Sequence, residues 1–469
     1  MSRIVVVSNR VAVARDPEKT RARAGGLAVA LEATLRESGG LWFGWSGETT
    51  QNRHRTPKVT KAGQVSYAIL DLTRAERNEY YNGFANQTLW PLFHYRTDLT
   101  TYERGHEKGY VEVNRFFARH LAKLLRQDDL VWVHDYHLLP MGEELRRLGI
   151  PQPMGFFLHI PFPPPEILLT LPNHEAIVRS LFAYDLVGFQ TPSDLRAFQV
   201  YVTQEAGGEV RRNSIVGAFG RTIRTQAFPI SIDTREFAEM ADSQAAKREY
   251  ERTRASMRGR ELILGVDRLD YSKGLREKFR SFERFLDQRA KSRGKVVLMQ
   301  IAPPSRGDVA EYREIRRDLE QLTGHINGRF SEPDWVPIRY LNRSFQRANL
   351  AGLYRASRVA LVTPFRDGMN LVAKEFVAAQ SPDDPGVLII SRFAGAAREL
   401  NDALVVNPYD TDGVANAINR ALTMRRRERV ERWSSMMDVL EDNDLTAWRR
   451  KYVGALRRTG LSARASRSL

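Results

Sequence analysis

The chain has 469 residues, a formal net charge of +16, 42% hydrophobic residues and no cysteine. Its length predicts two or three domains, and its ordinary apolar content excludes a disordered or collagen-like protein. The lack of cysteine excludes a disulfide framework, a thiol nucleophile and a thiolate zinc site. No apolar run approaches the roughly 18 residues of a membrane span, and the first ten residues are typical of a strand rather than a signal peptide. We therefore expect a cytoplasmic protein.

Short β-branched runs alternate with amphipathic helical patterns along the chain, which predicts parallel sheets wrapped by helices. In the first half we expect strands at residues 4–7, 130–134, 155–159, 186–190 and 221–230, and helices at 27–35, 141–148 and 193–204. In the second half we expect strands at 261–266, 296–301, 359–363 and 387–391, and helices at 275–286, 309–322, 371–379 and 414–424. A last amphipathic helix is expected at 446–456.

The two halves are separated by a polar, helix-prone segment at residues 234–260. We predict an α/β chain with two doubly wound domains, at residues 1–235 and 236–445. The helix and tail at 446–469 pack on one of them, with the N-terminal domain as one option. In such sheets ligands bind beyond the carboxyl ends of the strands, so the residues that follow each strand matter most.

Much of the positive charge is arginine in helical segments such as residues 424–429, which is typical of a solvated face. The alternative is an anionic partner. Since we find no nucleic-acid motif and no interleaving of basic and aromatic residues, the charge favours phosphorylated small molecules over nucleic acid.

Three strand ends in the first half carry polar side chains. Arg10 follows the first strand, and the pair Gly25 and Gly26 opens a helix where backbone amides can approach an anion, although a simple turn explains the pair equally well. Asp135 follows His134, and because neighbouring residues of a strand point to opposite faces, a hydrogen bond to a sugar suits Asp135 better than a metal does. His159 precedes a proline-rich loop that holds it at a strand end, where a function is favoured over a core position.

In the second half, the strand at 261–266 leads into a loop that contains Arg268 and Lys273. Their guanidinium fork and point charge suit a diphosphate better than a solvated surface, and the loop lacks Walker spacing. Another arginine, Arg306, lies beyond the strand at 296–301.

The strand at 359–363 runs into the segment Arg366 to Glu375. Here Gly368 permits a tight turn, and residues 369–372 present free N–H groups at a helix start. Glu375 lies one turn further, where a carboxylate can accept both ribose hydroxyls. The segment indicates a nucleotide-sugar site, and the alternative is a capped helix with a surface glutamate.

Taken together, these residues resemble the trehalose-6-phosphate synthases, a family of retaining glucosyltransferases with the GT-B fold. The matching stretches are Ser8-Asn9-Arg10, Gly25-Gly26-Leu27, Leu41 to Gly47, Tyr80-Tyr81-Asn82, Leu89-Trp90-Pro91, His134 to His137, Phe157 to Pro163, Asp267 to Gly274, Ser305 to Asp308 and Arg366 to Glu375. The resemblance implies two Rossmann-like domains with the active site in the cleft between them.

The resemblance also implies the reaction: glucose passes from UDP-glucose to glucose 6-phosphate, giving α,α-trehalose 6-phosphate and UDP. The residues implied for the acceptor are Arg10, Tyr81, Asp135 and Arg306, with Trp90 and Ile160 selecting its anomer. Those implied for the donor are Gly25, Gly26, Arg268, Lys273, Phe345, Leu371, Val372, Ala373, Lys374 and Glu375. His159 and Asp367 are implied at the donor sugar, and His159, Arg268, Lys273 and Asp367 form the catalytic set.

A double displacement needs a carboxylate nucleophile with a second acid nearby, and no carboxylate pair in the sequence clearly supplies them. The resemblance implies reaction on one face of the sugar, with the leaving phosphate helping to deprotonate the acceptor and without a metal or cofactor. The Asp-x-Asp sequences at 410–412 and 442–444 follow no site strand, and we interpret them as turn and helix-end acids.

Three alternatives stay open at this point. A sister enzyme would use another acceptor, such as glycerol 3-phosphate, or an ADP- or GDP-sugar. A non-catalytic sensor would keep the fold without turnover, and a nucleic-acid-binding protein rests on net charge alone. The arginine-rich loop from Val11 to Ala24 receives no role, and the oligomeric state is open, with a homodimer or homotetramer among the options.

Overall fold

The computed structural model describes residues 2–11, 31–32, 34–36, 39–304 and 310–465. These residues form two compact units, each with its own sheet. The first contains the described residues up to Pro229 together with those from Thr446 onward, and the second contains Ile230–Leu445. Within the described residues, the chain therefore passes between the units at residues 229–230 and at 445–446.

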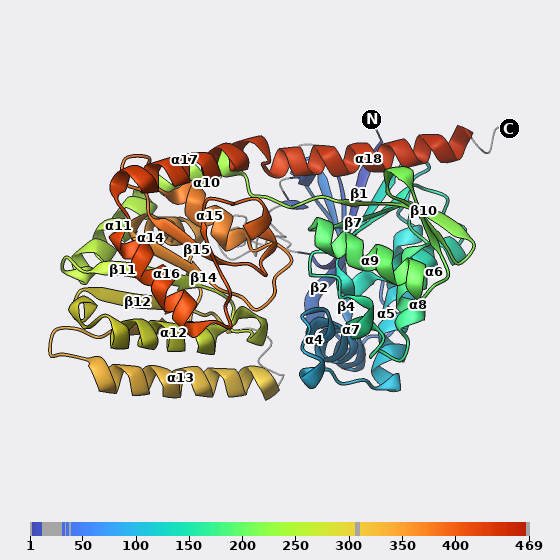
Figure 1. The fold of residues 1–469 in the computed structure, drawn as a ribbon. Helices are drawn as coiled ribbons and strands as arrows, with labels where there is room; N and C mark the ends of the chain where they lie inside the picture. Colours follow the sequence, from blue (N-terminus) through green and yellow to red (C-terminus); the bar gives the residue numbers. More distant parts are fainter. Residues whose placement is uncertain (1, 12–30, 33, 37–38, 305–309, 466–469) are drawn as a thin grey trace. The chain divides into compact units, whose positions relative to one another are not determined.

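The first unit is built on a ten-stranded sheet with the order β3-β4-β2-β1-β5-β6-β7-β10-β9-β8 (Figure 1). Its strands are β1 (Ile4–Arg10), β2 (Gly40–Thr49), β3 (Lys58–Ala62), β4 (Val65–Leu72), β5 (Leu130–His134), β6 (Met154–Phe157), β7 (Leu186–Phe189), β8 (Glu209–Arg211), β9 (Ile215–Ala218) and β10 (Arg221–Ala227). Neighbours from β4 to β10 pair in parallel, and the strands beyond them pair antiparallel. Helices cover both faces of this parallel core, which explains why β1 and β5 are continuous apolar runs.

The helices of the first unit lie between these strands in the sequence, except α18, which follows the second unit. They are α3 (Arg74–Glu76), the π-helical η1 (Arg77–Leu89), α4 (Trp90–Phe93), η2 (Thr97–Leu99), α5 (Arg104–Ala122), η3 (Tyr136–Leu138), α6 (Met141–Arg147), α7 (Pro165–Leu168), α8 (His174–Leu181), α9 (Pro192–Gln204), η4 (Arg212–Ser214) and α18 (Leu445–Ala465). Helix α9 begins where a capping box between Thr191 and Asp194 and a proline in the first turn predict a start.

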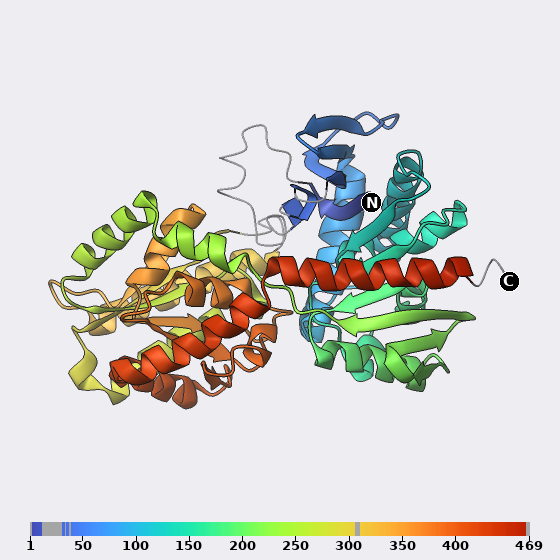
Figure 2. The ribbon, with the colours of Figure 1, turned by 90° about the horizontal axis from the view of Figure 1, so that it is seen from above.

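The long helix α18 packs on the sheet of the first unit (Figure 2). The Tyr452 ring stacks on Trp132 with ring centres 4.5 Å apart, and its hydroxyl donates to Phe156 O at 2.9 Å. The indole N–H of Trp448 donates to Phe228 O at 3.1 Å. Three aromatic contacts therefore fix this helix against β5, β6 and the end of β10.

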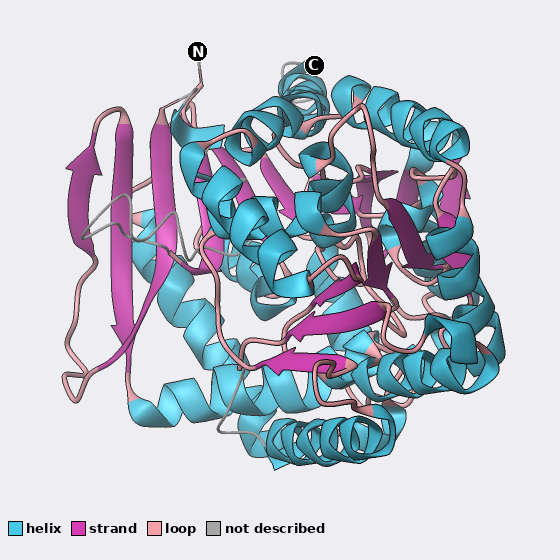
Figure 3. Ribbon diagram, turned by 90° about the vertical axis from the view of Figure 1, so that its left-hand side faces the viewer, coloured by secondary structure: helices cyan, strands magenta, loops and turns pink. Residues whose placement is uncertain are grey.

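The second unit has a six-stranded, fully parallel sheet with the order β13-β12-β11-β14-β15-β16. Its strands are β11 (Glu261–Val266), β12 (Val296–Ile301), β13 (Ile338–Leu341), β14 (Val359–Val362), β15 (Val387–Ser391) and β16 (Leu404–Val406). Its helices are α10 (Thr234–Ala241), α11 (Gln244–Met257), η5 (Tyr271–Lys273), α12 (Leu275–Gln288), η6 (Ala290–Ser292), α13 (Ala310–Phe330), α14 (Arg347–Ala356), α15 (Leu371–Ala379), η7 (Gly395–Arg398), α16 (Thr411–Thr423) and α17 (Arg426–Asp442). Figure 3 shows the strands between helices.

The prediction of two doubly wound α/β units is confirmed, and most predicted elements lie within a few residues of the observed ones. The sequence pattern did not predict β2, β3, β4, β8, β9, β13 and β16. The edge strand β3 is exposed at all five residues, so no apolar alternation marks it. The predicted helix at 27–35 lies mainly outside the described residues. In the described part of the chain, no helix is both long and apolar enough to cross a bilayer.

Candidate active site

The carboxyl ends of β1 and β5 lie side by side in the first unit, with Ser8 opposite His134 in the parallel register. Arg10 ends β1 and is exposed. A Cβ atom on Gly47 would lie only 2.5 Å from Arg10 Nε, so this glycine, at φ +91°, lets the guanidinium lie against the β2 backbone. Arg10, the residue predicted to bind the phosphate, is therefore held at the end of β1 while its guanidinium stays in contact with solvent.

Asp135, the residue after β5, has a strained backbone. Its φ of +76° is in the region that favours glycine, and such a residue costs on the order of 1 to 3 kcal/mol. Its N–H donates to Phe157 O at 2.8 Å, and its carboxylate accepts the N–H of His159 at 3.2 Å. The surroundings impose this conformation, and strain of this kind is concentrated at functional sites.

His159 follows β6 with its imidazole between two polar side chains. Its Nε2 lies 3.0 Å from His134 Nδ1, and its Nδ1 lies 3.4 Å from Gln190 Nε2. Although some of the ring remains exposed, burial lowers the pKa of His159 to about 3, and burial with the neighbouring His159 lowers that of His134. Both rings are therefore neutral, so His159 can serve a sugar as a hydrogen-bonding group but not as a cation. A sugar hydroxyl that binds Nδ1 must replace the long contact with Gln190.

Aromatic side chains surround η3, directly after Asp135. The Tyr81 ring stacks on His137 with ring centres 5.7 Å apart and meets Trp45 at 5.5 Å. Trp90 is buried, 5.6 Å from the Tyr136 ring, and Ile160 is buried next to His159. The structure therefore brings Tyr81 and Trp90 to the same short helix that Asp135 begins.

In the second unit, the loop after β11 is fixed by two buried aspartates. Asp267 accepts from Lys278 Nζ at 2.5 Å and from Gln300 Nε2 at 3.2 Å. Asp270 caps η5 through Ser272 and accepts from the Tyr312 hydroxyl at 3.1 Å. Arg268, which lies between them, is exposed. A rigid loop thus presents this guanidinium at the end of β11.

The ends of β11 and β14 are joined by an ion pair. Lys273 Nζ lies 2.5 Å from Asp367 Oδ2, which also accepts from Asn370 Nδ2 at 3.0 Å. Both partners are mostly shielded, with 10% and 17% of the side-chain surface exposed. Lys273 and Asp367 therefore form one unit in which the carboxylate orients the ammonium group.

The start of α15 differs from the prediction. We expected Gly368 to form the tight turn, but the left-handed residue is Asn370, at φ +80°. Its side chain accepts the N–H of Ala373 at 3.1 Å. Because an asparagine both tolerates this conformation and caps the helix, the amides available to a ligand are those of Leu371 and Val372, with Ala373 already bonded.

Glu375 and Phe345 lie further into the same unit. The Tyr354 hydroxyl donates to Glu375 Oε2 at 3.3 Å, and burial raises the pKa of Glu375 to about 7 while Arg347 opposes the rise. The ring of Phe345 lies under the Arg343 guanidinium at 4.9 Å, and it lines a cavity of about 300 Å³ together with Leu341 and Met299. These positions are compatible with contacts to a nucleoside.

The side chain of Lys374 makes its contacts inside the second unit. Its side chain is fully buried, and Nζ donates to Glu399 Oε2 at 2.7 Å and to Ile230 O at 2.8 Å. Since these partners occupy the ammonium group, only the backbone of Lys374 can reach a ligand. A contact of Lys374 with the donor would therefore run through its backbone, and it stays a prediction.

Several predicted residues lie outside the described part of the chain. They are Gly25, Gly26, Arg306 and the loop residues 12–24. Sequence reasoning also missed residues that support the site, namely Lys278, Gln190, Gln300, Asn370 and Glu399. Of these, Lys278 left a signal, because it is a charge on the apolar face of the predicted helix at 275–286.

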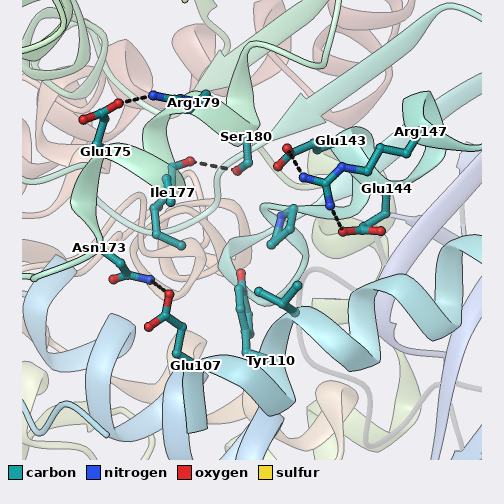
Figure 4. A pocket seen from close by; sticks show the side chains of 13 residues that line it. Glu107, Tyr110, Glu143, Glu144, Arg147, Asn173, Glu175, Ile177, Arg179 and Ser180 are labelled. Carbon is teal, nitrogen blue, oxygen red and sulfur yellow. Dashed lines mark hydrogen bonds and ion pairs between the residues drawn. The ribbon is translucent and has the colours of Figure 1, made fainter. Parts of the chain in front are cut away.

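A separate cavity of about 510 Å³ lies between α5, α6 and α8 of the first unit (Figure 4). Its polar groups bind one another: Arg147 Nη1 lies 2.8 Å from Glu144 Oε1, and Asn173 Nδ2 donates to Glu107 Oε1 at 2.7 Å. Of the predicted residues that the structure describes, none lines this cavity. In that same part of the chain, no group of three His, Asp or Glu residues is arranged to hold a metal ion.

The chain is similar to known proteins over nearly its whole length. The model of glycosyltransferase family 20 matches residues 2–458. A trehalose-6-phosphate synthase of Sinorhizobium fredii is 50% identical over 459 residues, which cover 97% of this chain and 98% of that protein. A crystal structure of a UDP-forming alpha,alpha-trehalose-phosphate synthase of Burkholderia xenovorans, in complex with glucose-6-phosphate, is 48% identical. The two structures superpose with a TM-score of 0.94, over 97% of this chain and 100% of the Burkholderia chain.

An Escherichia coli structure bound with UDP-2-fluoro glucose is 46% identical, with a TM-score of 0.92 and coverage of 97% and 99% of the two chains. The close superposition of these structures on both units confirms the GT-B fold that the resemblance implied.

Proposed function

The chain belongs to glycosyltransferase family 20, and on that premise we propose how its residues carry glucose from UDP-glucose to glucose 6-phosphate. The products are α,α-trehalose 6-phosphate and UDP, and the configuration at the transferred carbon is retained. The similar proteins support these substrates, since one structure contains glucose-6-phosphate and another UDP-2-fluoro glucose. Within this chain, the observation that carries the proposal is the Lys273–Asp367 pair beside Arg268, at the adjoining ends of β11 and β14.

The acceptor is held by the residues around η3. Arg10 binds the phosphate of glucose 6-phosphate together with Arg306, and Tyr81 donates a hydrogen bond to it. The Asp135 carboxylate accepts from sugar hydroxyls, and its strained backbone fixes its direction. Trp90 and Ile160, both buried, bound the pocket and select the anomer.

The donor is held by residues of the second unit, to which the resemblance adds Gly25 and Gly26. Arg268 and Lys273 bind the diphosphate, and the amides of Leu371 and Val372 add the positive end of a helix dipole. Glu375 accepts the ribose hydroxyls, and Phe345 contacts the base. Asp367 and His159 bind the hydroxyls of the transferred glucose, with His159 neutral as its lowered pKa requires.

Transfer proceeds on one face of the donor sugar. The bond from the anomeric carbon to the diphosphate oxygen breaks, and the anomeric hydroxyl oxygen of glucose 6-phosphate forms the new bond. The proton of that hydroxyl passes to an oxygen of the departing diphosphate. Arg268 and Lys273 lower the barrier because negative charge develops on the oxygens that they contact.

A panel of donors and acceptors tests the proposed substrates. UDP release is measured with UDP-, ADP- or GDP-glucose as donor, and with glucose 6-phosphate or glycerol 3-phosphate as acceptor. We expect the highest kcat/KM for UDP-glucose with glucose 6-phosphate. Faster turnover with glycerol 3-phosphate would overturn the acceptor assignment, and a preference for another nucleotide would overturn the donor assignment.

Two further expectations accompany this function. We place the enzyme in the cytoplasm, because both substrates are phosphorylated metabolites that do not cross a membrane unaided. A homodimer or homotetramer remains a prediction, and light scattering coupled to size-exclusion chromatography tests it.

A further inference from the structure

Lys374 lies in the stretch Leu371 to Glu375 that is proposed to bind the donor, yet its side chain is buried inside the second unit. It is fully buried, and its ammonium group is shared between the Glu399 carboxylate and the carbonyl of Ile230. Burial lowers the pKa of Lys374, whereas Glu399 raises it. A cation is expensive to bury unless it is paired, so this arrangement requires an explanation beyond filling the interior.

The partner Glu399 directly follows η7, and η7 is bonded to the loop that carries Asp367. The Gly395 N–H donates to Asp367 O at 3.1 Å, and the Ala396 N–H donates to Met369 O at 2.8 Å. The approach is so close that a Cβ on Gly395 would lie 2.0 Å from Gly368 O. The backbone of η7 therefore fixes the position of the loop that carries Asp367.

These contacts close a ring within the second unit. The ring runs from the Asp367 loop into α15, through the Lys374–Glu399 ion pair to η7, and back to the Asp367 loop through the backbone bonds. Without the ion pair, η7 would still hold the loop, but the side-chain link between η7 and α15 would be lost. The ring thus sets the Asp367 carboxylate and the first amides of α15 in one fixed relation.

The second contact of Lys374, with Ile230, joins the same ring to the segment that enters the unit. Ile230 is the first residue of the second unit, and its carbonyl accepts from Lys374 Nζ at 2.8 Å. Nearby, the Leu445 N–H donates to Ile232 O at 2.9 Å, and the Thr234 hydroxyl donates to Leu440 O at 2.9 Å. The lysine therefore joins α15, η7 and this segment at a single buried point.

We propose that Lys374 is a positioning residue for the sugar-nucleotide donor: its ion pair with Glu399 holds α15 and Asp367 in the relation that binds UDP-glucose. Its side chain does not touch the donor. The inference rests on the proposed function, because it assigns the donor to Asp367 and α15.

The experiment compares four variants of the full chain: Lys374→Met, Glu399→Gln, the double variant with both changes, and Arg429→Met. Arg429 is the matched control, since it is also buried in the second unit, bonds the Asp384 carboxylate at 2.6 Å and the Pro385 carbonyl, and has no contact with the donor loop. Calorimetry measures the Kd for UDP, thermal unfolding measures Tm, and steady-state kinetics measures KM for each substrate.

We expect Lys374→Met to weaken UDP binding and raise KM for UDP-glucose about tenfold, while KM for glucose 6-phosphate changes less than twofold. Arg429→Met should lower Tm and leave both KM values within twofold. The double variant removes the unpaired Glu399 charge, so its Tm recovers toward that of the unmodified protein. Its UDP affinity stays low because the ion pair between residues 374 and 399 is still absent.

Recovery of UDP affinity together with Tm in the double variant would overturn the proposal, since the effect would then arise from folding alone. Unchanged UDP affinity in Lys374→Met would overturn it as well. Failure of the proposed function looks different: the unmodified protein would then show no turnover of UDP-glucose with glucose 6-phosphate, whatever the variants do.

Discussion

In the first unit, the predicted acceptor residues lie among aromatic rings and hydrogen bonds, whereas in the second unit the predicted donor residues lie among ion pairs. Tyr81 stacks on His137, and His159 contacts a second neutral histidine. By contrast, Lys273 is paired with Asp367 and Lys278 with Asp267, both at 2.5 Å. Rings and neutral hydrogen bonds shape a pocket for one hexose, while orientated cations stabilise charge on a departing diphosphate. Under the proposed function, the cations that stabilise the leaving diphosphate are therefore those of the second unit.

The largest effect should come from Arg268→Ala. Because Arg268 stabilises charge that develops only as the diphosphate leaves, we expect kcat/KM to fall about 10³-fold. Since the residue is exposed, Tm should change little. The measurement is UDP release, and Arg427→Ala, an exposed helical arginine 91% accessible, is the control. Activity within tenfold of the unmodified enzyme would show that Arg268 does not act on the leaving group.

A smaller effect should follow from Asp135→Asn in the first unit. We expect kcat/KM for glucose 6-phosphate to fall about 10²-fold, because a carboxylate accepts sugar hydroxyls more strongly than an amide does.

In urea unfolding, Asp135→Gly should be about 1 kcal/mol more stable than Asp135→Ala, since only glycine relieves the positive φ. Equal stability of the two would contradict the strained backbone.

The neutral histidines predict a pH dependence of stability in the first unit. The pKa of His159 is about 3 when folded and near 6.5 when unfolded, so the stability due to the neutral ring is complete above pH 6.5. It is lost as the pH falls toward 3, because the unfolded chain binds the proton more readily. Between pH 7 and 5 we expect a loss of about 1 kcal/mol, reduced from the full value because the ring is partly exposed. The free energy of unfolding of His159→Gln, measured in urea, should lack this part of the decline with pH. Equal declines in the variant and the unmodified protein would contradict the role of His159.

The smallest effect concerns Glu375. With a pKa of about 7, its carboxylate ionises between pH 6 and 8, and the ionised form accepts ribose hydroxyls better. We expect UDP-glucose to bind about threefold more tightly at pH 8 than at pH 6. UDP-glucose has no group that titrates in this range. Any change in Kd that calorimetry measures between the two pH values therefore comes from groups of the protein. Glu375→Gln should remove the difference, and a difference that persists in this variant would belong to another group.

The strands that carry the site were predictable because both faces of a parallel strand are buried. The ranges 130–134, 261–266, 296–301 and 387–391 coincide with β5, β11, β12 and β15. Edge strands such as β3 and β13 escaped prediction because their faces are exposed or half-buried. The double winding followed from the alternation of strands and helices alone.

Positions of site residues were predictable to the strand end but not beyond it. The sequence indicates that Arg268 and Asp367 follow strands, yet the parallel pairing of β11 with β14 that brings Lys273 to Asp367 is a property of the topology. Lys374 shows the limit most clearly, because its burial depends on where η7 and Ile230 pass. The same holds for Asn370, whose left-handed backbone displaces the turn expected at Gly368.

The most direct test of the account is a crystal structure of the enzyme soaked with UDP and glucose 6-phosphate together. We predict the diphosphate within hydrogen-bond distance of Arg268 and Lys273, and the sugar of glucose 6-phosphate beside Asp135. Ligands seated elsewhere, with these side chains untouched, would contradict the division of donor and acceptor between the two units.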